Sequence, residues 1–227
     1  MNERKQLILN IIIEDYIATG LPVASNSIVE KYNLDLSPAT VRNEMAELEA
    51  EGWITQPYTS AGRIPTEKAY LFFVDSLKTE SLSKKEQVLF EDLDGDEITA
   101  KQIAKKLAQV SNLAVIWAFH KNHIYYTGLS NLLQQPEFSQ SRLTYDISAV
   151  IDRVDEIVDD IFEQVSFDPQ ILLGRNSPFG PFSGTILARY KTPQGVGMIG
   201  ILGPLRMDYG KNLARISYLI NHYNQLS

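Results

Sequence analysis

Two neighbouring side chains, Arg42 and Asn43, are of the types that read base edges in duplex DNA. Arginine can donate two hydrogen bonds to guanine, and asparagine can pair in the same bidentate way with adenine. Shortly before them stand Ser37, Ala39 and Thr40, whose small or polar side chains let the backbone approach DNA closely. The sequence therefore predicts that the segment from Ser37 to Asn43 enters a DNA groove.

A second group of small and polar residues, Thr59, Ser60 and Gly62, precedes Arg63. Glycine permits a close backbone approach to a ligand. Arginine supplies one cation for a phosphate or for the minor groove. We therefore predict that Gly62 and Arg63 form a second DNA contact at the tip of a hairpin, whose connecting residues include Thr59 and Ser60.

The surrounding pattern predicts the elements that position both groups. Apolar spacing and start and stop signals indicate helices over 3–19, 26–32, 38–50 and 67–77. N-caps are expected at Ser25, Ser37 and Thr66. Two short extended segments are expected over 53–56 and 63–65. Ser37 followed by Pro38 is a strong helix start, because proline at the first helical position loses no hydrogen bond. Three helices followed by a hairpin predict a winged helix-turn-helix over residues 1–77, which places its third helix in a major groove.

The charge of this segment opposes binding to a polyanion. The chain has a formal net charge of −7, and residues 1–77 hold six Lys and Arg side chains against eleven Asp and Glu. DNA binding must then depend on a few well-placed cations and backbone amides, with weak nonspecific affinity. Helix-turn-helix units also dock proteins, so a protein-docking scaffold is an alternative that the acidic charge favours.

The rest of the chain predicts a linker and a second domain. Residues 78–98 contain LSKKEQ and an acidic cluster, which indicates a linker, and part of it can be helical. Residues 99–227 are expected to form an α+β domain with a mainly antiparallel sheet and helices. Helices are expected over 100–111 and 142–165, and a third begins after Asp208. Strands are expected in NLAVIWAF and at 124–127, 171–173, 185–190 and 196–202. TPQG is expected to form the turn between the last two strands.

Several other classes of protein find little support. The absence of cysteine excludes disulfides and thiolate chemistry and fits the cytoplasm. The apolar run at 7–13 is too short to span a bilayer, so no membrane association is expected. No Ser, His and Asp set stands in a nucleophile motif, so we expect no catalytic residues and no enzyme.

Three weak motifs suggest a cofactor or a metal, and none is complete. GVGMIG at 195–200 lies in an expected strand, whereas a dinucleotide fingerprint needs a helix opening through it. The acidic residues around Gly95 lack the twelfth-position glutamate of a calcium loop. His120 and His123 are expected on opposite faces of an extended chain. We therefore expect no cofactor and no metal.

Longer stretches resemble one protein family. LILNIIIEDYIATGLPVAS, LSPATVRNEMAELEAEGWITQPYTSAGRIPT and AYLFFVDSL are similar to the winged-helix domain of the heat-inducible transcription repressor HrcA family. IYYTGLSNLLQQPEF and ARYKTPQGVGMIGILGPLRMDYGKNL resemble the GAF-like domain of that family. TSAGRIPT together with GPLRMDY is the most specific pair.

The resemblance implies a repressor that binds an inverted-repeat operator of chaperone genes as a dimer, with the GroE chaperonin as a partner. It also implies that 37–43 and 59–63 carry recognition. Members of the family usually carry an inserted dimerising domain within the GAF-like region. In this chain NLAVIWAF passes almost directly to HIYYTGLSN, so most of that inserted domain is missing. A GAF-like domain can also bind a small molecule, which leaves a ligand-responsive transcription regulator as an alternative.

Overall fold

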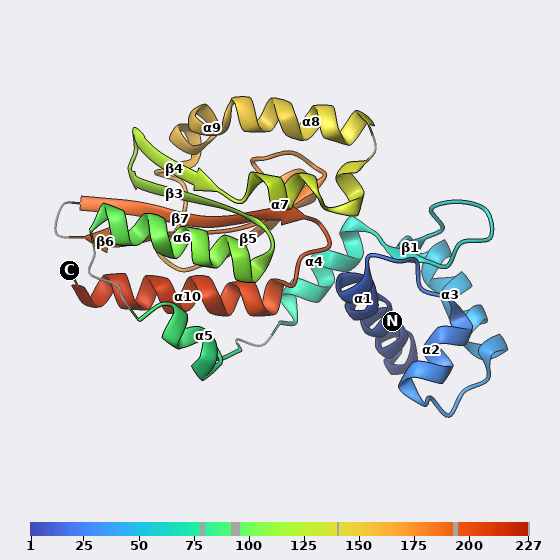
Figure 1. The fold of residues 1–227 in the computed structure, drawn as a ribbon. Helices are drawn as coiled ribbons and strands as arrows, with labels where there is room; N and C mark the ends of the chain where they lie inside the picture. The colour runs from blue at the N-terminus through green and yellow to red at the C-terminus, as the bar shows by residue number, and fades with distance from the viewer. Residues whose placement is uncertain (78–79, 92–95, 140, 193–194, 227) are drawn as a thin grey trace. The chain divides into compact units, whose positions relative to one another are not determined.

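The computed structural model describes residues 1–77, 80–91, 96–139, 141–192 and 195–226. The chain divides into two units, Met1–Leu77 and Lys78–Ser227. The first unit contains, in chain order, α1 (Glu3–Thr19), α2 (Ser25–Tyr32), α3 (Pro38–Ala50), β1 (Ile54–Thr55), β2 (Ile64–Pro65) and α4 (Glu67–Asp75) (Figure 1). The two strands pair in antiparallel fashion.

Local signals explain where the helices of the first unit begin and end. α1 ends where Gly20 adopts a left-handed conformation (φ 68°), which glycine reaches at no steric cost. Thr66 caps α4, as predicted, by accepting a hydrogen bond from the Ala69 N–H. The predicted cap at Ser25 is wrong: α2 starts at Ser25 itself, and Ala24 is the capping residue.

The helices of the first unit enclose a small apolar core. Its fully buried side chains come from α1, α2 and α3 and include Ile8, Ile12, Ile28, Val41 and Leu48. These residues recur at helical spacing, so each helix turns one stripe inward and leaves the opposite stripe to solvent. The outer stripe of α3 is therefore available for other contacts.

The second unit is a five-stranded antiparallel sheet with helices on both faces. The strand order is β4–β3–β7–β6–β5, built from β3 (Ala114–His120), β4 (His123–Thr127), β5 (Gln170–Leu173), β6 (Ser183–Thr192) and β7 (Gly195–Pro204). All neighbouring strands are antiparallel. The α+β architecture with a mainly antiparallel sheet is confirmed, and it is consistent with a GAF-like domain.

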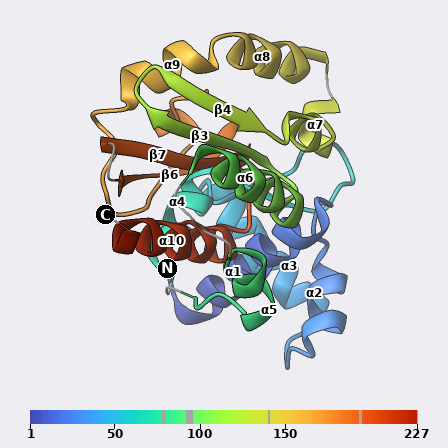
Figure 2. The same ribbon diagram turned by 60° about the vertical axis from the view of Figure 1, so that its left-hand side comes forward.

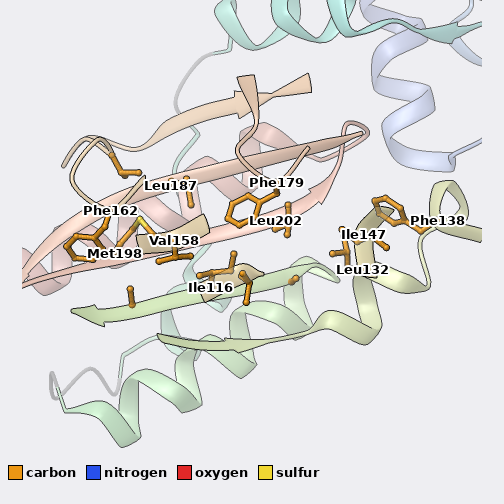
Figure 3. Packing of buried hydrophobic residues seen from close by; sticks show 14 residues of the cluster. Ile116, Leu132, Phe138, Ile147, Val158, Phe162, Phe179, Leu187, Met198 and Leu202 are labelled. Atoms are coloured by element: carbon orange, nitrogen blue, oxygen red, sulfur yellow. The ribbon is translucent and has the colours of Figure 1, made fainter. Parts of the chain in front are cut away.

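The sheet lies between two layers of helices (Figures 1 and 2). Successive residues of a strand point to opposite faces of the sheet, so each strand contributes side chains to both layers. On one face, Ile116 and Met198 pack with Val158 in a cluster that α7 (Leu129–Leu133), α8 (Ser141–Asp152) and α9 (Val154–Ile161) help to form (Figure 3). On the other face, Trp117 contacts Tyr223 with ring centroids 5.6 Å apart. That face is covered by α6 (Glu97–Ser111) and α10 (Tyr209–Leu226).

One predicted helix of the second unit is divided, and the segment expected to be a linker is partly helical. The single helix expected over 142–165 is two helices, because Arg153 leaves the helical conformation (φ −118°, ψ 14°) between α8 and α9. Within the segment expected to be a linker, Lys84–Leu89 forms the short helix α5, and Phe90 is fully buried. Pro193 and Gln194 of the expected TPQG turn lie outside the described residues.

The glycines of GVGMIG have a packing role. They lie within β7, as expected, and a Cβ on Gly197 would stand 2.3 Å from Cζ of Tyr190. A Cβ on Gly200 would stand 2.2 Å from Cδ2 of Leu187. These two glycines therefore make room for side chains of β6, and no helix opens through the motif as a dinucleotide site requires.

Candidate nucleic-acid interface

The amino-terminal end of α3 is fixed by one serine. The Ser37 hydroxyl accepts a hydrogen bond from the Thr40 N–H at 3.1 Å and lies 2.9 Å from Thr40 Oγ1. Pro38 occupies the first turn, as predicted. Ser37 and Ala39 are exposed and Thr40 is half-buried. The first turn of α3 therefore presents a small, polar surface to solvent.

Arg42 and Asn43 lie on the exposed face of α3. Their neighbours Val41 and Met45 are buried, so the helix turns these two side chains outward. Among the described residues, neither side chain has a hydrogen-bond or ion-pair partner. Arg42 and Asn43 can therefore donate hydrogen bonds to a ligand without first breaking contacts of their own.

The other Lys and Arg side chains of residues 1–77, all of which the structure describes, have partners. Four form ion pairs: Arg4 with Glu44, Lys5 with Glu47 and Glu51, Lys31 with Asp15, and Arg63 with Glu49. Lys68 donates to the carbonyl of Glu51 at 2.8 Å, and its Nζ lies 3.9 Å from the centroid of the Trp53 ring. Arg42 is thus the free cation among these six side chains.

The acidic residues on the second half of α3 and at its C-cap, Glu51, are largely neutralised by these ion pairs. Glu44 is buried and paired with Arg4, while Glu47 and Glu51 share the Lys5 ammonium at 2.7 Å each. The hydrogen bond from Lys5 lowers the pKa of the Glu51 carboxyl, and the Trp53 indole N–H adds to the effect. The same two glutamates raise the pKa of Lys5. These carboxylates are therefore balanced locally by ion pairs, and none of them is paired with Arg42.

The loop between β1 and β2 carries the second predicted group. Thr59 and Ser60 are exposed, and Ser60 has a positive φ of 68°. The loop is closed by hydrogen bonds from the Ala61 N–H to the Tyr58 carbonyl (3.0 Å) and from Gln56 Nε2 to the Ala61 carbonyl (3.0 Å). These two contacts constrain the backbone of the loop that carries Thr59 and Ser60.

Gly62 and Arg63 do not lie at the tip of the hairpin. The backbone of Arg63 exchanges two hydrogen bonds with Val23, at 2.8 and 2.9 Å, beside β2. A Cβ on Gly62 would stand 2.4 Å from the Val23 carbonyl oxygen, so the close backbone approach that glycine permits here is to the protein itself. The predicted placement of these two residues at the tip is wrong.

Two residues of this region were not singled out from the sequence. Tyr58 stands directly before Thr59 on the loop, and 66% of its surface is exposed. Its position next to the predicted contact residues was the signal that could have identified it. Glu49 holds Arg63, and no local pattern could reveal this contact, because the two residues belong to different elements.

The remaining candidate sites give no metal centre. His120 and His123 are cross-strand neighbours with ring centroids 5.3 Å apart, so the expectation of opposite faces is wrong. The chain reverses at Lys121 and Asn122, so the two histidines do not lie on one extended strand. The rule that places residues three apart on opposite faces of a strand therefore does not hold for them. Within the described part of the chain, no cluster of three metal-binding side chains occurs. Asp94 and Gly95 of the weak calcium motif lie outside it.

The described helices include none with the length and apolar character that crossing a membrane requires.

Comparisons with known proteins identify the family of this chain. A family model described as the HrcA protein C-terminal domain matches residues 35–213. The heat-inducible transcription repressor HrcA of Natranaerobius thermophilus is 49% identical over 119 residues, which cover 49% of this chain and 34% of that protein. The matched segment thus spans about a third of the relative. These relatives are named for transcription repression and not for an enzymatic reaction, in agreement with the prediction of a non-enzymatic protein.

A second relative aligns from end to end. The heat-inducible transcription repressor HrcA of Carboxydothermus hydrogenoformans is 26% identical over 336 aligned positions, covering 100% of this chain and 98% of that protein. This chain has 227 residues, so a large internal part of the relative has no counterpart here. A crystal structure described as that of a hypothetical protein shares the fold, with a TM-score of 0.81 and 18% identity over 100% of this chain and 98% of the other.

The family model covers most of the chain, including α3, the β1–β2 hairpin and all five strands of the sheet. The chain belongs to the HrcA family.

Proposed function

We propose that this chain is a transcriptional repressor that binds a specific duplex DNA sequence through residues 1–77, acting as a winged helix-turn-helix. α3 is the recognition helix and the β1–β2 loop is the wing. The observation that carries the proposal is Arg42, an exposed cation without an intramolecular partner in a unit whose other described cations are paired. The names of the relatives support repression as the outcome of binding.

Each residue of the interface has a distinct role in this proposal. Arg42 donates to the major-groove edge of a guanine and Asn43 pairs with an adenine. Ser37, Ala39 and Thr40 allow the first turn of α3 to lie close to the phosphates and orient it in the groove. Thr59 and Ser60 contact the backbone beside the groove. Few cations take part, so affinity for unrelated DNA is low and sequence discrimination rests on base contacts.

The repressor acts as a homodimer on an inverted repeat. A two-fold dimer presents two recognition helices to half-sites about one helical turn, roughly 34 to 36 Å, apart. The operators are those of chaperone genes, and GroE chaperonin is a partner that keeps the repressor active. Heating removes the DNA-competent fold and releases the genes. Since the target is cytoplasmic DNA, the protein works in the cytoplasm.

Selection from a pool of random duplexes tests the proposal and identifies the operator in the same experiment. The full chain is bound to the pool at moderate salt, and the retained duplexes are sequenced over several rounds. Enrichment of one inverted repeat, with light scattering showing a dimer, supports the repressor. A pool that stays random contradicts it and favours a protein-docking scaffold. Enrichment only when a small molecule is added favours a ligand-responsive regulator.

A further inference from the structure

Arg63 is held by a carboxylate of the proposed recognition helix. Its Nε and Nη2 both lie 2.9 Å from Oε2 of Glu49, and its Nη1 donates to the Ala61 carbonyl at 3.4 Å. The arginine side chain is 23% exposed and the glutamate 34%. The guanidinium therefore lies near the surface, three residues after Ser60 of the loop, with a carboxylate where a phosphate could stand.

The hairpin does not depend on this ion pair for its position. Two backbone hydrogen bonds join Arg63 to Val23, the β1–β2 ladder pairs Ile54 with Pro65, and Gly62 fits closely against Val23. A partly exposed ion pair contributes roughly 0 to 1 kcal/mol to stability. The contact is thus poorly explained by folding alone, and its effect on the charge offered to DNA is the larger consequence.

We infer that Glu49 is a positioning residue that keeps the Arg63 guanidinium from DNA phosphates and so holds sequence-independent affinity low. This inference rests on the proposed DNA-binding function. A carboxylate and a phosphate compete for the same guanidinium, because both accept its N–H groups, and here Nε and Nη2 of Arg63 both lie on one oxygen of Glu49. Base reading by Arg42 and Asn43 is unaffected by this competition, since neither contacts Glu49.

Glu49→Gln removes the negative charge of the side chain and keeps its shape, so only a weaker, neutral hydrogen bond to the amide oxygen can hold Arg63. Arg63 can then exchange that bond for a phosphate contact, so binding to any duplex tightens by about three- to tenfold and the slope of log K against log salt steepens by about 0.9. A purely structural role for Glu49 predicts the opposite, namely weaker binding. The measurement is affinity for the selected duplex and for a scrambled duplex of equal length over a series of salt concentrations.

Glu47→Gln is the matched control. Glu47 lies on the same helix, loses the same charge on substitution, and pairs with Lys5 instead of Arg63. Any effect of net charge alone appears in both variants. A double variant with Arg63→Gln completes the cycle, because the gain from Glu49→Gln must vanish when Arg63 is absent. Thermal unfolding of each variant shows whether the fold is retained.

The inference is supported if Glu49→Gln tightens binding to both duplexes more than Glu47→Gln does and only when Arg63 is present. Equal gains in the two variants, no gain, or weaker binding overturn it. The proposed function is tested separately, since it requires the wild-type chain to enrich one duplex from the random pool. A wild type that enriches none, while Glu49→Gln still binds a random duplex more tightly than the wild type does, contradicts specific repression and leaves the Glu49 inference standing.

Discussion

Ser37 and Thr40 are joined twice at the start of α3, once through the Thr40 N–H and once through the two hydroxyls. The pair satisfies a backbone donor that the helix itself leaves without a partner. It therefore stabilises the first turn of α3, shortly before Arg42 and Asn43, within the proposed interface.

Replacing Ser37 by alanine removes this cap and is expected to cost about 1 kcal/mol of stability. Thermal unfolding should show a lower Tm, and affinity for the selected duplex should fall. Ser83→Ala is the control, because Ser83 caps α5 by accepting from the Glu86 N–H and lies outside residues 1–77. Equal losses of DNA affinity in the two variants would speak against a positioning role for Ser37.

Tyr58 is expected to contact the DNA backbone from the loop. Its ring is largely exposed, so Tyr58→Ala should leave the Tm unchanged. Binding to selected and scrambled duplexes should weaken by the same factor, since backbone contacts carry no sequence information. Tyr58→Phe separates a hydrogen bond of the hydroxyl from a contact of the ring. Unchanged affinity of Tyr58→Ala for both duplexes would remove this residue from the interface.

Gly62→Ala is expected to destabilise the first unit. The new Cβ would lie 2.4 Å from the Val23 carbonyl oxygen and 2.8 Å from the Pro22 carbonyl carbon, so the backbone must shift. Such overpacking typically costs about 1 to 3 kcal/mol. Chemical denaturation measures the loss, with Thr59→Ala on the exposed loop as the control. A variant with unchanged stability but weaker DNA binding would restore the glycine to the DNA contact predicted from the sequence.

The ion pair of Lys5 with Glu51 makes stability depend on pH in the acid range. The Lys5 hydrogen bond lowers the pKa of Glu51 below its ordinary value of 4.5, so folding favours the charged carboxylate. This contribution is complete above pH 4.5 and is lost as the pH falls through the lowered pKa. Thermal unfolding from about pH 7 to about pH 3 should show a smaller acid loss of Tm in Glu51→Gln than in the wild type. Parallel curves would contradict the assignment.

The start of α3 could be predicted because its signal is local. Ser37 and Pro38 are adjacent, and the buried residues Val41, Met45 and Leu48 recur at helical spacing, so capping and periodicity agree. The strands of the second unit were likewise predictable from apolar runs. Helices and strands can therefore be predicted from residue spacing where residues close together in the sequence determine the local structure.

The contacts that change the interpretation of the site are non-local. Arg63 pairs with Glu49 from another element, and Gly62 packs against Val23, so neither role could be predicted from the residues around them. The prediction for His120 and His123 was wrong for a related reason: a turn between them replaced extended spacing by cross-strand pairing. Periodicity also continued through Arg153, where the backbone breaks the predicted helix in two.

Arg42 is the residue on which the central claim depends, and its contact with DNA can be observed chemically. Methylation of guanine N7 reads the major-groove edge that an arginine occupies. With the selected duplex bound, the wild type should protect one guanine in each half-site, and Arg42→Ala should lose that protection together with about 1 to 3 kcal/mol of base discrimination. Lys84→Ala, which removes an exposed cation from α5, should leave the protection intact. Equal methylation of free and wild-type-bound duplex would contradict recognition by α3.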